Sequence, residues 1–179
     1  MHEYKRIGRD LVYKGSIIDY YKDTIEVANG NTVKWDFIDH HGAAAVVPVT
    51  DDGKLLMVRQ YRNALDRYTL EIPAGGMNPG EDYKVAAARE LEEETGYKSD
   101  ELEFLIKVNT TVAFCNEEIG IYVARNLVKS EQRLDEDEYI DVVAMDVEEL
   151  CNMIYEAKIK DGKTISAILA YKNKYVEKN

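Results

Sequence analysis

The sequence predicts an α/β fold that is preceded by a small antiparallel sheet. Residues 1–41 alternate in a strand-like way around turn residues, as expected for that sheet. Residues 43–49 are continuously apolar, which is typical of a strand covered on both faces. Residues 81–95 are rich in Ala and Glu, which favours a helix. With 179 residues, 45% of them hydrophobic, the chain is long enough for one domain with a small appendage.

The N-terminal segment is expected to form hairpins. Residues 29–31 (Asn-Gly-Asn) are typical of a tight turn between two strands, and residues 32–35 supply the return strand. The segment has few large apolar residues, and a small sheet of this kind is only marginally stable alone. We therefore expect residues 1–41 to pack on something else, such as a partner subunit.

Residues 42–179 are expected to form the main domain. The helix over residues 81–95 follows the breaker sequence Asn-Pro-Gly at residues 78–80 and ends at Gly96. Residues 134–138 are acidic and are expected to form a loop. The remaining predicted strands cover residues 55–58, 66–72, 102–111, 119–124 and 140–145, and two further helices cover residues 147–158 and 163–175.

Charge and cysteine content exclude several classes of protein. A net charge of −11 argues against a protein that binds nucleic acid, because such proteins concentrate Lys and Arg. Residues 1–10 are polar, which predicts no signal peptide, and no apolar run approaches the length that spans a membrane. Cys115 and Cys151 lack paired spacing, which favours reduced thiols in a cytoplasmic protein.

Four carboxylates crowd the end of the helix predicted at residues 81–95. Glu90 and Glu94 lie one turn apart with Glu93 beside them, and like charges at this spacing destabilise a helix. Negative charge at a helix C-terminus also opposes the helix dipole. A bound divalent cation would relieve both effects, and carboxylate oxygens suit Mg²⁺. The simpler alternative is a solvated acidic face.

Residues 75–97 resemble the complete Nudix box. The spacing is far more specific than that of a short glycine motif. The resemblance implies an α/β/α sandwich with a mixed sheet, and hydrolysis of a diphosphate that joins a nucleoside to a second group. Tyr97 alone departs, because a smaller aliphatic residue is usual there. The matching positions are Gly75, Glu81, Arg89-Glu90-Leu91, Glu93-Glu94 and Gly96-Tyr97.

The similarity extends to the ADP-ribose pyrophosphatase branch of that family. It is carried by residues 59–62 (Arg-Gln-Tyr-Arg), 70–75 (Leu-Glu-Ile-Pro-Ala-Gly) and 161–164 (Asp-Gly-Lys-Thr). Members of the branch use their N-terminal strands to form a dimer. The resemblance therefore implies a homodimer, with residues 1–41 as the dimerisation segment and residues 42–179 as the hydrolase domain.

The resemblance also assigns roles to residues of the box and of the loop after it. Glu117 would orient or deprotonate the attacking water, with Glu118 as the alternative. Arg89 lies four residues before Glu93 and would hold that carboxylate in one rotamer, so both join Glu117 as expected catalytic residues. The cofactor would be Mg²⁺, with Mn²⁺ as a substitute. The expected metal ligands are the carbonyl of Ala74 and the carboxylates of Glu90, Glu93, Glu94 and Glu117.

Four residues are expected to contact the substrate, namely Arg59, Arg62, Glu71 and Gly75. Guanidinium groups can fork onto phosphate oxygens. Only one of Arg59 and Arg62 need do so, since their odd spacing places them on opposite faces of a strand, and a salt bridge at the strand end is the alternative. Glu71 would brace an arginine or the substrate.

The loop after the box leaves the identity of the substrate open. Val112 and Ala113 stand where the branch usually has Pro and Gly, and that proline marks ADP-ribose preference in the family. ADP-ribose is therefore the first expectation, and other nucleotide sugars such as GDP-mannose are the alternative. A second class of protein is a nucleotide-binding module without catalysis, which would have no need of the intact acidic set around Arg89.

Overall fold

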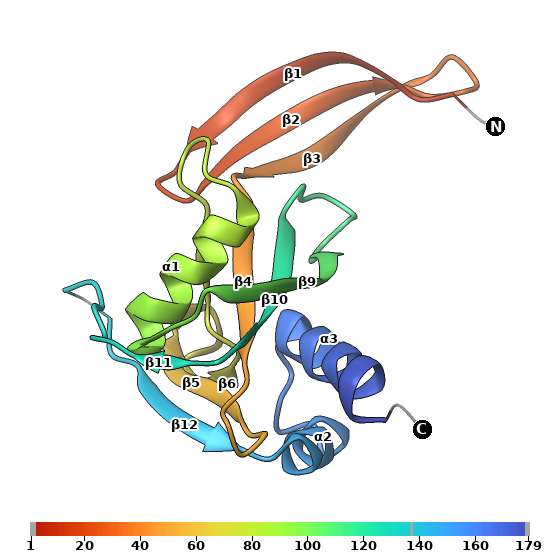
Figure 1. Ribbon diagram of the computed structural model, residues 1–179. Helices are drawn as coiled ribbons and strands as arrows, with labels where there is room; N and C mark the ends of the chain where they lie inside the picture. Colours follow the sequence, from red (N-terminus) through yellow and green to blue (C-terminus); the bar gives the residue numbers. More distant parts are fainter. Residues whose placement is uncertain (1–2, 137, 178–179) are drawn as a thin grey trace. The chain divides into compact units, whose positions relative to one another are not determined.

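The computed structural model describes residues 3–136 and 138–177 (Figure 1). The chain divides into two compact units, Met1–Gly42 with Asn109–Glu118, and Ala43–Val108 with Ile119–Asn179. Residues 109–118 belong to the first unit by their contacts, and the predicted domain boundary at residue 42 stays a prediction. One of these contacts is a hydrogen bond: the N–H of Ile38 donates to the carbonyl of Phe114 over 2.7 Å.

The first unit is built on an antiparallel sheet in the order β1-β2-β3 (Figure 1). Its strands are β1 (Lys5–Lys14), β2 (Ile18–Glu26) and β3 (Thr32–His40). The turn between β2 and β3 falls at residues 29–31, as predicted. Gly30 has a φ of 81°, which glycine adopts without strain, and the side-chain oxygen of Asn29 accepts the N–H of Asn31 over 3.0 Å.

The second unit contains a mixed four-stranded sheet in the order β7-β4-β10-β9. Strand β10 runs parallel to β4, and β7 runs antiparallel to it on the other side. A second, antiparallel sheet has the order β12-β5-β6, and β8 pairs with β11. The bounds are β4 (Ala43–Pro48), β5 (Leu55–Arg62), β6 (Arg67–Glu71), β7 (Ala74–Gly76), β8 (Tyr97–Lys98), β9 (Glu101–Asn109), β10 (Glu118–Arg125), β11 (Val128–Lys129) and β12 (Asp141–Met145).

Strand β4 is covered on both faces, as its apolar run predicts. Ala44 and Val46 pack with Leu91 of α1 (Tyr83–Thr95). Ala45 and Val47, which point the other way, belong to the cluster formed with α2 (Val147–Tyr155) and α3 (Gly162–Tyr171). Because successive residues of a strand alternate between faces, the helices lie on opposite sides of the sheet (Figure 1). This confirms the α/β/α sandwich.

Helix ends differ from the expected bounds for local reasons. Helix α1 begins at Tyr83 because Asp82 acts as its N-cap, accepting the N–H of Lys84 over 2.8 Å. It ends at Gly96, which has a φ of 69°, as predicted. Helix α3 ends at Tyr171 and continues as a π-helical turn, Lys172–Val176. The loop expected at residues 134–138 includes residue 137, which lies outside the described residues.

Candidate active site

Strand β7 and helix α1 approach each other closely at the predicted box. The N–H of Ala74 donates to a carboxylate oxygen of Glu94 over 3.0 Å. A Cβ atom built on Gly75 would lie 2.1 Å from a carboxylate oxygen of Glu90. A side chain at residue 75 would therefore displace that carboxylate. Glycine at this position lets Glu90 and Glu94, both buried, lie against the backbone of β7.

Arg89 binds four neighbours with all of its donor groups. Its Nε and Nη2 donate to the two carboxylate oxygens of Glu81 over 3.0 and 2.9 Å, and Nη2 also donates to the carbonyl of Gly76 over 2.9 Å. Its Nη1 donates to Glu90 over 2.5 Å and to Glu93 over 3.0 Å. A guanidinium has five N–H donors, so these five bonds use its full capacity. Arg89 thus joins the loop and the helix, including the predicted pair with Glu93.

The carboxyl groups of Glu90 and Glu94 are hard to ionise in this environment. Burial raises the pKa of Glu90 to about 6, against the opposing effect of Arg89. Burial also raises the pKa of Glu94 to about 8, against the hydrogen bond from Ala74, and the charge of Glu90 adds to the rise. Two buried acids one helical turn apart favour a nearby positive charge.

The chemistry of these donors fits a divalent cation. Carboxylate and carbonyl oxygens are the ligands that Mg²⁺ prefers. Among residues 3–136 and 138–177, no group of three or more His, Cys, Asp or Glu side chains is arranged to hold a metal ion. In this structure, Nη1 of Arg89 pairs with the carboxylates of both Glu90 and Glu93. Each of these carboxylates accepts Nη1 of Arg89 through one oxygen, so its other oxygen could still bind a metal ion.

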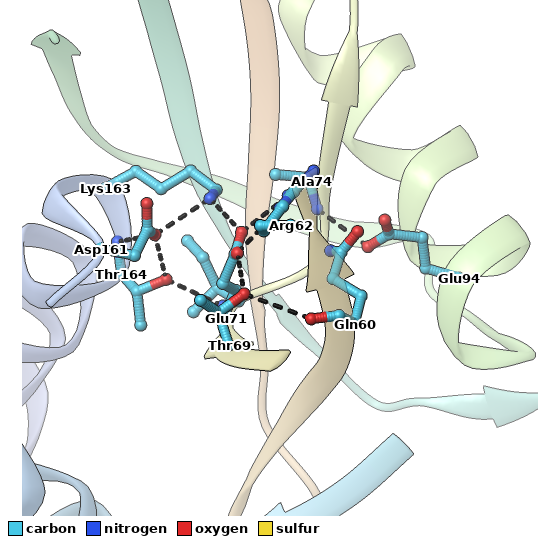
Figure 2. A network of polar contacts seen from close by, with 10 residues as sticks. Gln60, Arg62, Thr69, Glu71, Ala74, Glu94, Asp161, Lys163 and Thr164 are labelled. Carbon is cyan, nitrogen blue, oxygen red and sulfur yellow. Dashed lines mark hydrogen bonds and ion pairs between the residues drawn. The ribbon is translucent and has the colours of Figure 1, made fainter. Parts of the chain in front are cut away.

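Arg62 and Glu71 form a half-buried ion pair beside the box (Figure 2). The Nε and Nη2 of Arg62 donate to the two carboxylate oxygens of Glu71 over 2.9 and 2.7 Å. Thr69 and Lys163 also donate to Glu71. Burial raises the pKa of Glu71, but the hydrogen bonds from Arg62 and Lys163 outweigh it and hold the pKa at about 2. Of the two expected roles, Glu71 takes that of bracing an arginine.

Arg59 lies apart from that pair. Its guanidinium carbon lies 5.3 Å from the ring centre of Tyr68, and its side chain is exposed. The odd spacing between Arg59 and Arg62 thus separates them as expected. Lys163 and Thr164 belong to a motif quoted in the sequence, but their contacts with Glu71 at the end of β6 and with Ile72 after it were not predicted. Those contacts join residues 92 positions apart, which no local pattern reveals.

Glu117 belongs to the first unit. Its carboxylate accepts the hydroxyl of Thr110 over 2.5 Å, and its other oxygen lies 3.6 Å from Nε2 of His40. The Nδ1 of His40 accepts the N–H of Gly42 over 3.0 Å, which agrees with a structural role for this histidine. Glu118 begins β10. The assignment of Glu117 or Glu118 as general base stays a prediction.

The sequence model of the NUDIX domain matches residues 39–168. The chain belongs to the Nudix family. A relative in Bacillus methanolicus, named methanol dehydrogenase activator, is 41% identical over 170 residues, which cover 94% of this chain and 92% of the relative. An ADP-ribose pyrophosphatase of Bacillus subtilis (strain 168) is 37% identical over 168 residues, which cover 93% of this chain and 91% of that one. The predicted family and its enzyme class, a pyrophosphohydrolase, are confirmed.

A solved structure supports the Nudix fold. The crystal structure of an ADP compounds hydrolase matches with a TM-score of 0.85 and 23% identity, covering 96% of this chain and 93% of that one. At this level of identity the match bears on the fold alone.

Proposed function

We propose that this Nudix protein hydrolyses the diphosphate bond of ADP-ribose or a related nucleoside diphosphate sugar in the presence of Mg²⁺. Water adds to one phosphorus, the bond from that phosphorus to the bridging oxygen breaks, and the products are a nucleoside monophosphate and a sugar phosphate. The observation that carries this proposal is the packing of Glu90 and Glu94 against β7 at the box. The names of relatives, ADP-ribose pyrophosphatase and ADP compounds hydrolase, support the choice of substrate.

The metal would be held by the carbonyl of Ala74 and by three carboxylates of α1, with Mn²⁺ able to substitute. When bound, Mg²⁺ neutralises charge on the phosphate oxygens as water attacks. Arg62 would bind a phosphate oxygen, because its side chain is 40% exposed and only its Nε and Nη2 donate to Glu71. Gly75 would contact the substrate through its backbone, since the carboxylate of Glu90 occupies the place of a side chain there. The three carboxylates are those of Glu90, Glu93 and Glu94.

The test is a hydrolysis assay on a panel of nucleoside diphosphate derivatives that includes ADP-ribose and GDP-mannose, with Mg²⁺ or Mn²⁺. We expect ADP-ribose to be cleaved fastest, and Glu94→Gln to abolish turnover while the protein stays folded. Glu92→Gln is the matched control, since Glu92 lies on the same helix and pairs with Ser130 and Arg133 instead. Absence of cleavage with either metal would refute the proposed activity, and full activity of Glu94→Gln would refute the assignment of the metal ligands.

The assignment of the general base has its own test. Glu117→Gln should lower kcat by about 10²–10⁴, the usual size of a general-base contribution. Glu118→Gln should then retain most of the activity. The reverse result would move the role to Glu118.

A second candidate function is a regulatory protein that binds a nucleotide without cleaving it. The observation that favours it is the name of the relative in Bacillus methanolicus, which describes an effect on another enzyme. The same panel separates the two functions. Binding of a nucleotide by calorimetry without release of product would support the regulatory candidate.

We also propose a cytoplasmic homodimer joined through residues 1–41. Cys115 and Cys151 are both free thiols, which suits a reducing compartment. In the part of the chain that the structure describes, no helix is long and apolar enough to cross a membrane. The net charge of −11 does not suit a nucleic acid partner.

A further inference from the structure

The start of helix α3 contributes a buried lysine to the site. The side chain of Lys163 is only 11% exposed. Its Nζ donates to Glu71 over 2.5 Å and to Asp161 over 2.9 Å (Figure 2). A buried ammonium group is costly unless it is paired, so these two carboxylates determine where Lys163 lies. The proposed reaction uses glutamates to bind the metal and a water molecule to attack phosphorus, and neither of these steps uses Lys163.

Glu71 is saturated with donors. One of its oxygens accepts the Nε of Arg62 over 2.9 Å and the hydroxyl of Thr69 over 2.6 Å. The other accepts the Nη2 of Arg62 over 2.7 Å and the Nζ of Lys163. A carboxylate has about four acceptor positions, and all are used here. Glu71 is therefore a bracing group with no acceptor left for a ligand.

Arg62 is held by one edge and free along the other. Only its Nε and Nη2 bind Glu71, and its Nη1 has no hydrogen bond to any residue that the structure describes. The side chain is 40% exposed, whereas that of Glu71 is 3% exposed. Two parallel bonds fix the plane of a guanidinium, so less freedom is lost when the open edge binds an anion.

Lys163 changes the charge that Arg62 presents. Without Lys163, the negative charge of Glu71 would neutralise the positive charge of Arg62. Lys163 supplies a second cation to the same carboxylate, so the three groups together carry one positive charge. Asp161 pairs with Lys163 and also caps α3 by accepting the N–H of Thr164 over 3.0 Å, and it brings the formal charge of the four groups to zero. Asp161 binds Lys163 and not Arg62, so the open edge of Arg62 can still attract a phosphate oxygen.

The same cluster also fixes the strand that leads to the box. The hydroxyl of Thr164 donates to Asp161 over 2.6 Å and accepts the N–H of Ile72 over 3.0 Å. Thr164 is fully buried, and Ile72 lies two residues before Ala74. The start of α3 therefore holds both Glu71 and the backbone next to it in place (Figure 2).

We propose that Lys163 is a positioning residue for the diphosphate of the substrate, acting through Glu71 to hold Arg62 with its free edge open to a phosphate oxygen. The proposal rests on the proposed function in one respect, which is that Arg62 binds phosphate. According to this proposal, the motif at residues 161–164 increases the affinity of the protein for its substrate. Lys163 itself does not touch the substrate.

A double-mutant cycle with Arg62 tests this role. Lys163→Met should raise KM about tenfold or more, the size expected for losing a hydrogen bond to a charged group, and kcat should change little. The Kd for an ADP-ribose analogue with a methylene in place of the bridging oxygen should rise equally by calorimetry. In the Arg62→Met background, Lys163→Met should have no further effect on KM or Kd, because it acts through Arg62.

Controls separate positioning from stability. Lys163→Arg should restore KM to within about threefold, because its fork still reaches a carboxylate. Lys172→Met, which removes a helix lysine paired with Glu148, should leave KM unchanged. If Lys163→Met does not fold, Lys163→Gln removes the charge, keeps a donor for Glu71 and serves the same test.

Three results with Lys163→Met would overturn the proposal. The first is an unchanged KM and Kd in Lys163→Met. The second is that the effects of Lys163→Met and Arg62→Met add up in the double mutant. The third is that Lys163→Met lowers kcat and thermal stability without changing KM or Kd. An unchanged Kd in Arg62→Met would also overturn the proposal. In that case, cleavage of a nucleoside diphosphate derivative from the panel would still support the proposed function. If the wild-type protein binds the analogue and cleaves nothing, the proposed function fails, and calorimetry still decides the role of Lys163.

Discussion

Gly75 is the residue at which the smallest change should have the largest effect on the site. A Cβ atom there would meet the carboxylate of Glu90 at 2.1 to 2.3 Å, whereas a Cβ on Gly76 would meet nothing within 4 Å. The carboxylate is the end of a flexible side chain, so Gly75→Ala should keep the fold and displace Glu90. We expect kcat/KM to fall about 10²-fold, since small misplacements cost that much.

Gly76→Ala is the matched control for that prediction. It adds the same methyl group to the next residue of β7, and we expect activity within about twofold of the wild type because the space is open. Steady-state kinetics and thermal unfolding of both variants check the pair. Equal losses in the two variants would show that flexibility of β7, and not the position of Glu90, limits the reaction.

The depressed pKa of Glu71 predicts how the protein responds to acid. The group is ionised above its ordinary pKa of about 4.5 and keeps its charge in the fold down to about 2. It therefore contributes stability that is present above pH 4.5 and lost as pH falls toward 2, about 3 kcal/mol for a shift of this size. Urea unfolding of Glu71→Gln should show a weaker loss of stability between pH 5 and pH 3 than the wild type shows. Parallel pH profiles would contradict this.

Single residues show where sequence patterns stop being informative. The pair of Arg89 with Glu93 follows from their spacing of four, and the structure contains it. The bonds from Arg89 to Glu81 and to the carbonyl of Gly76 depend on how the loop folds back, which spacing does not specify. In the same way, the odd spacing separates Arg59 from Arg62, but only the fold brings Lys163 to Glu71.

Among the elements, the two C-terminal helices offer a direct comparison of capping. Asp161 caps α3 and accepts bonds from the N–H and hydroxyl of Thr164, whereas Asp146 at the start of α2 makes no side-chain cap bond. Asp161→Ala should lower the free energy of unfolding by about 1–2 kcal/mol, and Asp146→Ala by less than about 0.5 kcal/mol. Denaturant titration measures both. A larger loss in Asp146→Ala would contradict the capping assignment.

Elements with a strong local pattern were predicted well, and those defined by distant contacts were not. The apolar run of β4 and the helix that ends at Gly96 both lie where the sequence places them. Residues 109–118 have no such pattern. Their place in the first unit depends on a single bridge between Ile38 and Cys115 and on nearby hydrogen bonds, which form only when the chain folds. Contacts between segments so far apart in the sequence leave no local pattern from which they could be predicted.

For the whole molecule, the first unit leaves much apolar surface uncovered. Large apolar side chains on and around its sheet are exposed, some by half or more, and exposed apolar patches commonly mark interfaces. Tyr4 and Trp35 even pack on each other at a ring distance of 5.9 Å while both stay open to solvent. The exposed side chains in residues 3–41 are Tyr4, Ile7, Leu11, Val12, Tyr13, Ile17, Ile18 and Trp35.

This surface leads to a prediction about assembly. A second copy of the chain would cover it, so the wild-type protein should sediment as a dimer at micromolar concentration, twice the 20.5 kDa of one chain. Leu11→Glu introduces a charge on β1 at a residue that is 52% exposed, and it should shift the protein toward the monomer. Desolvating an unpaired carboxylate in an apolar interface costs several kcal/mol, on the order of a thousandfold in the dimer dissociation constant.

A matched variant makes the assembly experiment specific to the first unit. Val128→Glu adds the same charge at a residue of β11 that is 57% exposed, and it should leave the dimer intact. Sedimentation velocity of the three proteins at equal concentration gives the comparison, and circular dichroism checks that each is folded. A wild-type monomer at tens of micromolar would refute the dimer. Dissociation by Val128→Glu and not by Leu11→Glu would place the interface on the second unit instead.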